Sequence, residues 1–300
     1  MGSALSEEER RERIRADVKK FKECPDVKVN RAIVKFCSTS SSNLQQHLSK
    51  RKQKSYPTAD WLKKLAEKLA NLSPDPKLAG LGALAVAVFI DIVSATSSSE
   101  STKDALRCVF AEEKASEVWD QIDECLKRCV MNIDDDAELV SDIKRIECQL
   151  SVALTKLKNS MVRDGHMSSQ ALKAWVNGAA FHIQMLIHLV RLGGIQTCDP
   201  VERLLPAYLS DLDLLFRKHK AAVERKCWLD YDILQDDPCP YFVSEEGEAY
   251  YIIYLEFEEY FEAYYEVHYI SQMYEIKKYF RKVRDDLPEL ASQVGHLSVY

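Results

Sequence analysis

The chain holds few side chains whose type and spacing could form a metal centre. Cys125 and Cys129 lie four residues apart, with Cys148 further along, and such a helical pair can supply two zinc ligands. A zinc site normally needs a second closely spaced pair, and the sequence contains none. His182 and His188 are six residues apart, which places them on different helix faces, and neither has a carboxylate at a ligand or orienting position nearby. We therefore predict no metal site, small buried thiols and ordinary helix histidines.

Motifs of cofactor binding and covalent catalysis are equally sparse. Residues 80–85, GLGALA, match the dinucleotide pattern G-x-G-x-x-A in form. The segment before them, Ser-Pro-Asp-Pro at 73–76, is not the strand that must deliver such a loop to a pyrophosphate. No G-x-S-x-G, H-E-x-x-H or P-loop pattern occurs, and no pattern selects a Cys–His pair whose members are distant in sequence. We expect no catalytic residue, no cofactor and a non-enzymatic protein.

The first residues, MGSALS, fit the minimal pattern for a lipid anchor. Gly2, once Met1 is removed, and Ser6 satisfy the N-myristoylation motif. One myristoyl chain anchors only marginally, so a second signal is needed, and the basic cluster at residues 50–54 is a candidate for it. The acidic residues 7–9 oppose binding to an anionic leaflet. Gly2 is thus a lipidation candidate, with a helix lead-in or a cloning remnant as the alternative.

The most hydrophobic segment runs from Leu78 to Val93 and carries a single charge, at Asp91. Its sixteen residues fall short of the roughly 20 that span a bilayer. We predict a buried central helix of a bundle. The alternatives are conditional membrane insertion, when the bundle opens, and a constitutive span. The candidates for membrane contact are Leu78, Leu81, Leu84, Val86, Val88, Phe89, Ile90 and Ile92.

The end of the chain is rich in tyrosine and acid. Twelve of the 14 tyrosines follow residue 230, together with 15 Asp/Glu and 5 Lys/Arg. Aromatic positions recur at intervals of four and three from Tyr250 to His268, which predicts a helix, with a strand over 250–257 as the alternative. Three tyrosines that follow acidic residues are candidates for phosphorylation or partner binding, and a packed aromatic face is the alternative. They are Tyr260, Tyr264 and Tyr265.

Helical periodicity runs through most of the chain, and only 9 Gly and 9 Pro interrupt it. The aspartates at 134–136 are a helix N-terminal signal, and glycines at 165 and 193–194 are C-terminal signals. The later helices have about 25–30 residues, or about 40–45 Å, which predicts an elongated bundle. The predicted helices span 6–23, 28–37, 44–54, 58–72, 102–132, 135–163, 168–192 and 199–229.

Charge is distributed unevenly along the 300 residues. Residues 1–72 carry 17 Lys/Arg and 9 Asp/Glu. Residues 73–300 carry 24 Lys/Arg and 38 Asp/Glu. This polarity predicts contact between the two regions, or a basic surface offered to an anionic membrane. Nucleic acid is not an expected partner, because the basic stretch lacks interleaved aromatics. An odd number of cysteines, nine, and a charged N-terminus predict an intracellular, cytoplasmic protein, with peripheral membrane attachment as a further expectation.

One stretch resembles a known family. Residues 154–191, LTKLKNSMVRDGHMSSQALKAWVNGAAFHIQMLIHLVR, are similar to a segment of the rapunzel-like proteins of fishes and the broader cephalotoxin-like group. The apolar segment 78–93 and the helix at 212–223 fall in the same order as in those proteins. The resemblance implies a mostly helical fold, supplies no catalytic residues and raises the expectation of membrane action.

These observations predict an all-α fold, an elongated bundle of long amphipathic helices around the apolar helix 78–93. Three regions are expected: a basic one at 1–72, the bundle core at 73–230 and an acidic, tyrosine-rich segment at 231–300. The favoured function is membrane interaction by a bundle like that of a pore-forming toxin, with its apolar helix shielded. The alternative is an adaptor that binds a protein partner, or a second copy of itself, through the tyrosine-rich helix.

Overall fold

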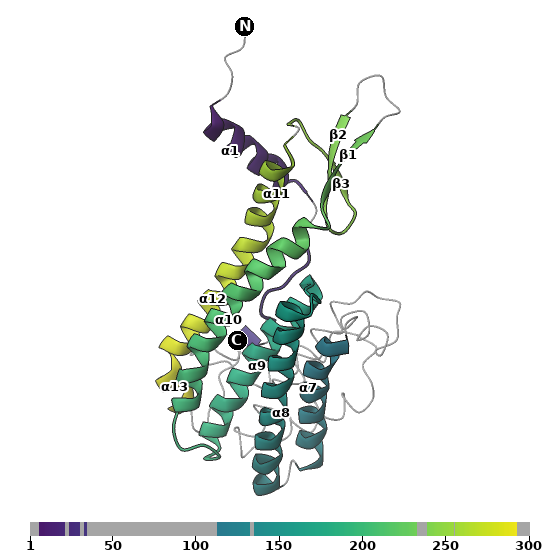
Figure 1. The fold of residues 1–300 in the computed structure, drawn as a ribbon. Coiled ribbons are helices and arrows are strands. Elements are labelled where there is room, and N and C mark those ends of the chain that lie inside the picture. Colours follow the sequence, from purple (N-terminus) through teal and green to yellow (C-terminus); the bar gives the residue numbers. More distant parts are fainter. Residues whose placement is uncertain are drawn as a thin grey trace, which may run out of the picture.

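The computed structural model shows a bundle of long helices with a small antiparallel sheet at one end (Figure 1). The fold is mostly α, as the sequence predicts. The predicted helices at 44–54, 58–72 and 78–93, and most of 28–37, lie outside the described residues. The structure describes residues 6–21, 24–30, 33–34, 113–132, 135–232, 239–254 and 256–292.

Three consecutive helices, α7, α8 and α9, pack against one another, and α10 packs on α8 and α9. The side chain of Asp135 accepts hydrogen bonds from two N–H groups at the start of α8, so the predicted N-terminal signal is confirmed. Gly165 and Gly193 have φ of 80° and 71°, and they lie just after α8 and α9 as predicted. The bounds are α7 (Glu113–Met131), α8 (Asp136–Arg163), α9 (Ser169–Arg191) and α10 (Asp199–Glu224).

Helix α9 is the central element of the described bundle. Nineteen of its 23 residues are buried, so it has no solvent-facing stripe. At Gly178 an added Cβ would lie 2.5 Å from Val118 Cγ1 and 2.8 Å from Leu154 Cδ2. The absence of a side chain there lets α7 and α8 approach the α9 backbone closely. The central position predicted for 78–93 is therefore held, among the described residues, by α9.

The C-terminal helices lie along the outside of this bundle. They are α11 (Phe257–Tyr265), the π-helical turn η1 (Glu266–Ile270), α12 (Ser271–Asp285) and α13 (Leu287–Ser292). Helix α12 packs on α10, and α13 packs on α9. The predicted helix from Tyr250 onward is correct only from Phe257. Tyr250 and Tyr251 belong to a strand, as the alternative over 250–257 proposes, but that strand ends at Tyr251.

The sheet consists of β1 (Trp228–Asp232), β2 (Cys239–Val243) and β3 (Ala249–Tyr251), in the order β1-β2-β3. Phe242 in the middle strand pairs with Leu229 on one side and Tyr250 on the other. The helix predicted over 199–229 ends at Glu224, because the chain enters β1 at Trp228. The expected division of the chain between residues 230 and 231 lies within the range of β1.

Helix α1 (Glu7–Val18) packs on α11, at the sheet end of the molecule (Figure 1). The Ser6 hydroxyl accepts a hydrogen bond from the Glu9 N–H, and the Glu9 carboxylate accepts one from the Ser6 N–H. This capping box fixes the start of the helix, as the predicted start at residue 6 requires. The helix ends at Val18 rather than at residue 23. Its buried side chains are Ile14 and Val18.

His188 is the exception among the polar residues of α9. It is fully buried, and neither ring nitrogen has a hydrogen-bond partner within the part of the chain that the structure describes. Burial, and secondarily the charge of Arg191, lowers the pKa of His188 well below its usual value of 6.5. The imidazole is therefore held neutral in the core.

We expect His188→Leu to be neutral or stabilising at pH 8, because it removes unpaired buried polar atoms. Below its ordinary pKa the unfolded chain binds a proton at residue 188 that the folded chain does not, so the wild type loses stability on acidification. The variant lacks this loss, and its advantage should grow by up to about 2 kcal/mol between pH 8 and pH 5. Urea unfolding at both pH values measures this. If the free energy of unfolding depended on pH equally in the wild type and in His188→Leu, His188 would not be held neutral in the core.

Candidate functional site

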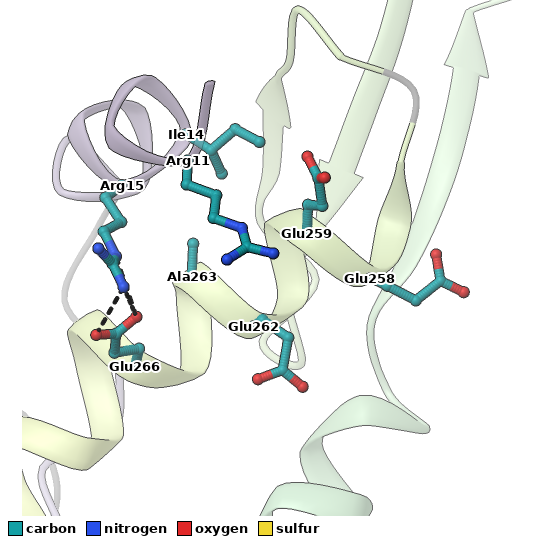
Figure 2. A pocket seen from close by; sticks show the side chains of 8 residues that line it. All are labelled: Arg11, Ile14, Arg15, Glu258, Glu259, Glu262, Ala263 and Glu266. Carbon is teal, nitrogen blue, oxygen red and sulfur yellow. Dashed lines mark hydrogen bonds and ion pairs between the residues drawn. The ribbon is translucent and has the colours of Figure 1, made fainter. Parts of the chain in front are cut away.

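Helix α1, the sheet and α11 meet at one end of the molecule (Figure 1). Arg10 forms ion pairs with Glu256 at 2.6 Å and with Glu259 at 2.8 Å. Arg15 donates from Nε and Nη2 to both carboxylate oxygens of Glu266 at 2.8–3.1 Å, as Figure 2 shows. The predicted contact between the basic N-terminal region and the acidic C-terminal region is thus confirmed at the α1–α11 interface.

The ion pairs orient α1, but apolar contacts hold it. Arg10 and Arg15 are partly exposed, and pairs of this kind contribute about 0.2–1 kcal/mol each. Ile14 and Val18 are buried completely, and burying an aliphatic side chain contributes about 1.5–3 kcal/mol. The guanidinium of Arg10 also lies 5.1 Å from the ring centroid of Tyr254. The balance favours the two aliphatic residues as the anchors of the helix.

A depression of about 330 Å³ lies between α1 and α11. In Figure 2, Arg11 extends from α1 toward α11 between Glu259 and Glu262, and it forms no ion pair with any described residue. Charges of both signs line this depression, together with Ile14 and Ala263, and no nucleophile lines it. Its chemistry is that of an interface between two helices.

An aromatic layer joins the sheet to α1 and α11. Phe21, just beyond α1, stacks on Tyr250 with ring centroids 3.9 Å apart, and its ring lies 6.0 Å from that of Phe242. Phe242 in turn lies 6.1 Å from Phe257 and 5.4 Å from Tyr264. One face of the sheet is therefore part of the core.

The opposite face of the sheet carries exposed aromatic residues. The register places Trp228, Tyr241 and Tyr251 on this outer face, because along the strands they alternate with Leu229, Phe242 and Tyr250, which pack against the core. Trp228 is 50% exposed and Tyr251 is 59% exposed. The Tyr241 and Tyr251 rings meet edge to face, 6.1 Å apart, and Ile253 just beyond β3 is 63% exposed.

This outer face belongs to a strongly acidic segment. Residues 228–251 contain seven acidic side chains and no Lys or Arg. We call Trp228, Tyr241, Tyr251 and Ile253, together with Asp230, which pairs with Tyr241, the sheet tip. In the sequence, the acidic residues of this segment are Asp230, Asp232, Asp236, Asp237, Glu245, Glu246 and Glu248.

Below the sheet tip, a polar cluster links three helices. Ser169 Oγ, at the start of α9, lies 2.9 Å from His219 Nε2 on α10. His219 Nδ1 lies 3.0 Å from Tyr265 Oη on α11. Tyr269 donates a hydrogen bond to the carboxylate of Glu245 and lies 3.3 Å from Ser169 Oγ. Sequence analysis missed this cluster, since Ser169 and His219 are 50 residues apart and neither belongs to a recognised motif.

A second polar chain corrects the prediction for His182. Its Nε2 lies 2.5 Å from Glu147 Oε1 on α8, and its Nδ1 lies 2.6 Å from Tyr208 Oη on α10. A carboxylate therefore does orient this ring, from 35 residues away. Burial tends to raise the pKa of Glu147, but the hydrogen bond and charge interaction with His182 outweigh it and lower that pKa. These two hydrogen bonds connect α8, α9 and α10.

The tyrosines proposed for phosphorylation or partner binding lie in the core. Tyr260, Tyr264 and Tyr265 are 0%, 2% and 2% exposed, so the packed aromatic face is what the structure shows. The Tyr265 hydroxyl donates to the Phe216 carbonyl at 3.0 Å, and the Tyr260 hydroxyl accepts from the Ile253 N–H. A kinase or a partner cannot reach these hydroxyls in the folded chain.

The remaining predicted site residues carry no site in the described structure. Gly2, the cluster at 50–54 and the apolar residues of 78–93 lie outside the described residues. Cys125 is buried and Cys148 is exposed. Within the described ranges, no three His, Cys, Asp or Glu side chains gather as metal ligands. None of the helices described is both long enough and apolar enough to cross a bilayer.

Comparison of the chain with protein-family models, curated proteins and solved structures finds no match. The candidate sites therefore rest on the geometry of this chain alone.

We expect Ile14→Ala to weaken the docking of α1 by about 2–4 kcal/mol, because it removes a fully buried side chain. Arg15→Ala should weaken docking by less than about 1 kcal/mol, because the ion pair is exposed. Hydrogen exchange of the α1 backbone amides measures both effects, with the exposed Arg13→Ala as the control. If Arg15→Ala freed α1 as much as Ile14→Ala, charge rather than packing would hold the helix.

Proposed function

We propose that the protein is a helical interaction protein that binds a basic surface of a protein partner through the sheet tip. The observation that carries this proposal is the group of exposed Trp228, Tyr251 and Ile253 at one end of the bundle. This is the adaptor alternative of the sequence analysis, with the binding surface moved from the buried tyrosines of α11 to the outer face of the sheet.

Side-chain chemistry supports a protein partner. Trp and Tyr are enriched among the residues that dominate protein interfaces, since they offer a large contact area at a low cost in side-chain entropy. Trp228 and Tyr251 stand on two different strands of one sheet, and the inner face of that sheet is packed through Phe242. The aromatic groups are therefore presented on a supported surface rather than on a loop.

Charge supports the choice of partner. Seven acidic side chains without a basic one in residues 228–251 attract a surface rich in Lys and Arg and repel anionic lipids or nucleic acid. The glutamates of α11 and its flanks add little to this potential, because ion pairs with Arg10, Arg15 and Lys220 compensate four of the five.

Selection of random peptides on the folded, full-length chain tests this function. We expect the enriched peptides to be cationic, and Trp228→Ala or Tyr251→Ala to weaken their binding by about 10-fold or more. Tyr274→Ala is the matched control, since Tyr274 is equally exposed but lies on α12, away from the sheet. Peptides without net positive charge, or equal binding to the sheet-tip variants and the control, would show that the sheet tip is not the binding surface.

A membrane step by residues 78–93 is the second candidate function. It is supported by the sixteen-residue segment whose only charge is Asp91, and by the resemblance of 154–191 to the cephalotoxin-like group. Gly2 and the basic cluster at 50–54 would add attachment to an anionic leaflet.

Flotation on vesicles of phosphatidylcholine with phosphatidylserine tests this second function. We expect the wild type to float and Asp91→Lys to change the bound fraction, because the substitution adds a cation to the apolar segment. Asp230→Lys is the control, since its charge change lies in the sheet tip. Equal flotation of the wild type and Asp91→Lys, or none, would leave protein binding as the supported function.

A further inference from the structure

A cavity of about 340 Å³ opens beside the start of α9, and the serine and histidine of the polar cluster lie on its wall. Ser169 Oγ and His219 Nε2 are 2.9 Å apart, which is within hydrogen-bond distance. Met167, Ala222 and Val223 supply the apolar part of the lining, and Lys226, Glu245 and Glu246 supply its charges.

The hydrogen bonds around His219 fix which ring nitrogen carries the proton. The Tyr265 hydroxyl has one proton and donates it to the Phe216 carbonyl at 3.0 Å. Its oxygen must therefore accept from His219 Nδ1, 3.0 Å away, so Nδ1 is protonated. Burial, and secondarily the charge of Lys226, lowers the pKa of His219 to about 3, so the ring is neutral. The lone pair of Nε2 then faces the Ser169 hydroxyl.

Tyr269 does not compete with His219 as the acceptor of the Ser169 proton. It gives its proton to Glu245, so its oxygen offers Ser169 no donor, and the Ser169 oxygen is 3.3 Å away from it. His219 Nε2 is the nearer acceptor for the Ser169 proton. A serine hydroxyl that donates to an imidazole lone pair, with the ring oriented on its far side, is the arrangement of an activated nucleophile.

The start of α9 supplies groups that can stabilise negative charge. Ser168 is the N-cap, and its hydroxyl accepts the Ala171 N–H while its carbonyl accepts the Leu172 N–H. The helix contains no acceptor for the N–H groups of Ser169 and Gln170, its first two residues. These groups carry the positive end of the helix dipole beside Ser169 Oγ. An oxyanion formed on a group that Ser169 attacks would lie next to them.

We propose that Ser169 is the nucleophile and His219 the general base of an acyl-transfer site for a small carboxylic ester. The cavity holds two glutamates against one lysine, so the ester is neutral or cationic. A second cavity, of about 220 Å³, shares Pro25, Ser169 and Gln170 with the first, so an ester bound at Ser169 has room for its acyl and alcohol parts in two adjoining spaces. This inference goes beyond the binding function proposed above and is an alternative to the expectation of a non-enzymatic protein.

The reaction balances with water as the second substrate. Ser169 Oγ attacks the ester carbonyl carbon while its proton moves to His219 Nε2, and the carbonyl oxygen becomes the oxyanion. Collapse of this intermediate breaks the bond to the alcohol, which leaves with the proton from His219. Water then attacks the acyl-serine and gives its proton to His219. The acid departs, and that proton returns to Ser169 Oγ.

A fluorophosphonate probe tests the nucleophile on the wild-type, full-length chain. We expect one adduct per chain, mapped to Ser169 by peptide mass spectrometry, and no adduct in Ser169→Ala. His219→Gln should slow labelling by about 100-fold or more. Ser271→Ala is the control, because the Ser271 hydroxyl only donates to the Val267 carbonyl within its own helix. An unlabelled wild type with native circular dichroism, or an adduct on another residue, overturns the proposal, and neither result depends on how a variant folds.

Tyr265 is a positioning residue, because it acts through the ring of His219. We expect ¹⁵N chemical shifts to show His219 protonated at Nδ1 in the wild type, and a shift toward the Nε2-protonated form in Tyr265→Phe. The variant should also lose fluorophosphonate labelling. A ring protonated at Nε2 in the wild type would leave Ser169 without a base and overturn the assignment.

Discussion

The burial of α9 on all sides is the constraint on which the rest of the structure depends. A polar side chain on such a helix cannot reach water, so its hydrogen bonds must come from neighbouring elements, and His188 is the exception that finds none among the described residues. Asn177 meets the segment at 28–30, where it accepts from the Asn30 N–H at 2.6 Å and donates to the Lys28 carbonyl. Gln184 donates to Tyr279 on α12, and Arg191 donates to the Leu290 carbonyl on α13. The polar residues of the central helix thereby fix the places of the elements around it.

The two ends of the described chain are joined by a different kind of contact. Arg15 and Glu266 are 251 residues apart in sequence, and the segment after α1 is also held by Gln272, which accepts from the Val27 N–H and donates to the Pro25 carbonyl. Contacts of such long range close a longer loop than contacts between consecutive helices, so they carry a larger cost in chain entropy. The buried Ile14 and Val18, rather than the partly exposed ion pairs, offset this cost.

The ends of a helix could be predicted from the sequence where the residues that cap it lie next to it in the chain. The ends of α8 follow from Asp135 and Gly165, because caps act within one helical turn. The strand at Tyr250 is only the alternative prediction, because the spacing from Tyr250 to Phe257 imitates a helix face, and strands β1 and β2 are not predicted. The two rings reach one aromatic layer from different elements, Tyr250 through Phe21 and Phe257 through Phe242. The period of a pattern shows which residues share a core, not which element carries them.

The polar pairs could not be predicted for a related reason. A search for a carboxylate near His182 in sequence misses Glu147, which is 35 residues away and is brought to the ring by the packing of α8 on α9. Ser169 has the sequence signature of an ordinary residue at a helix start. Only the position of α10 beside that start shows that its hydroxyl meets His219.

The π turn η1 lets α11 and α12 place Tyr265 against His219 and Gln272 against the segment that follows α1. Tyr265 must face His219, while seven residues later Gln272 must face the segment that follows α1. In an uninterrupted α-helix each residue advances by about 100°, so the facing of the second position is set by the first. A π turn includes one additional residue, which shifts the facing of everything after it by about that angle. It also places Tyr269 against His219, with ring centroids 4.7 Å apart. The local departure from α geometry thus lies where the polar cluster is assembled, between the helix that orients His219 and the helix that holds the N-terminal segment.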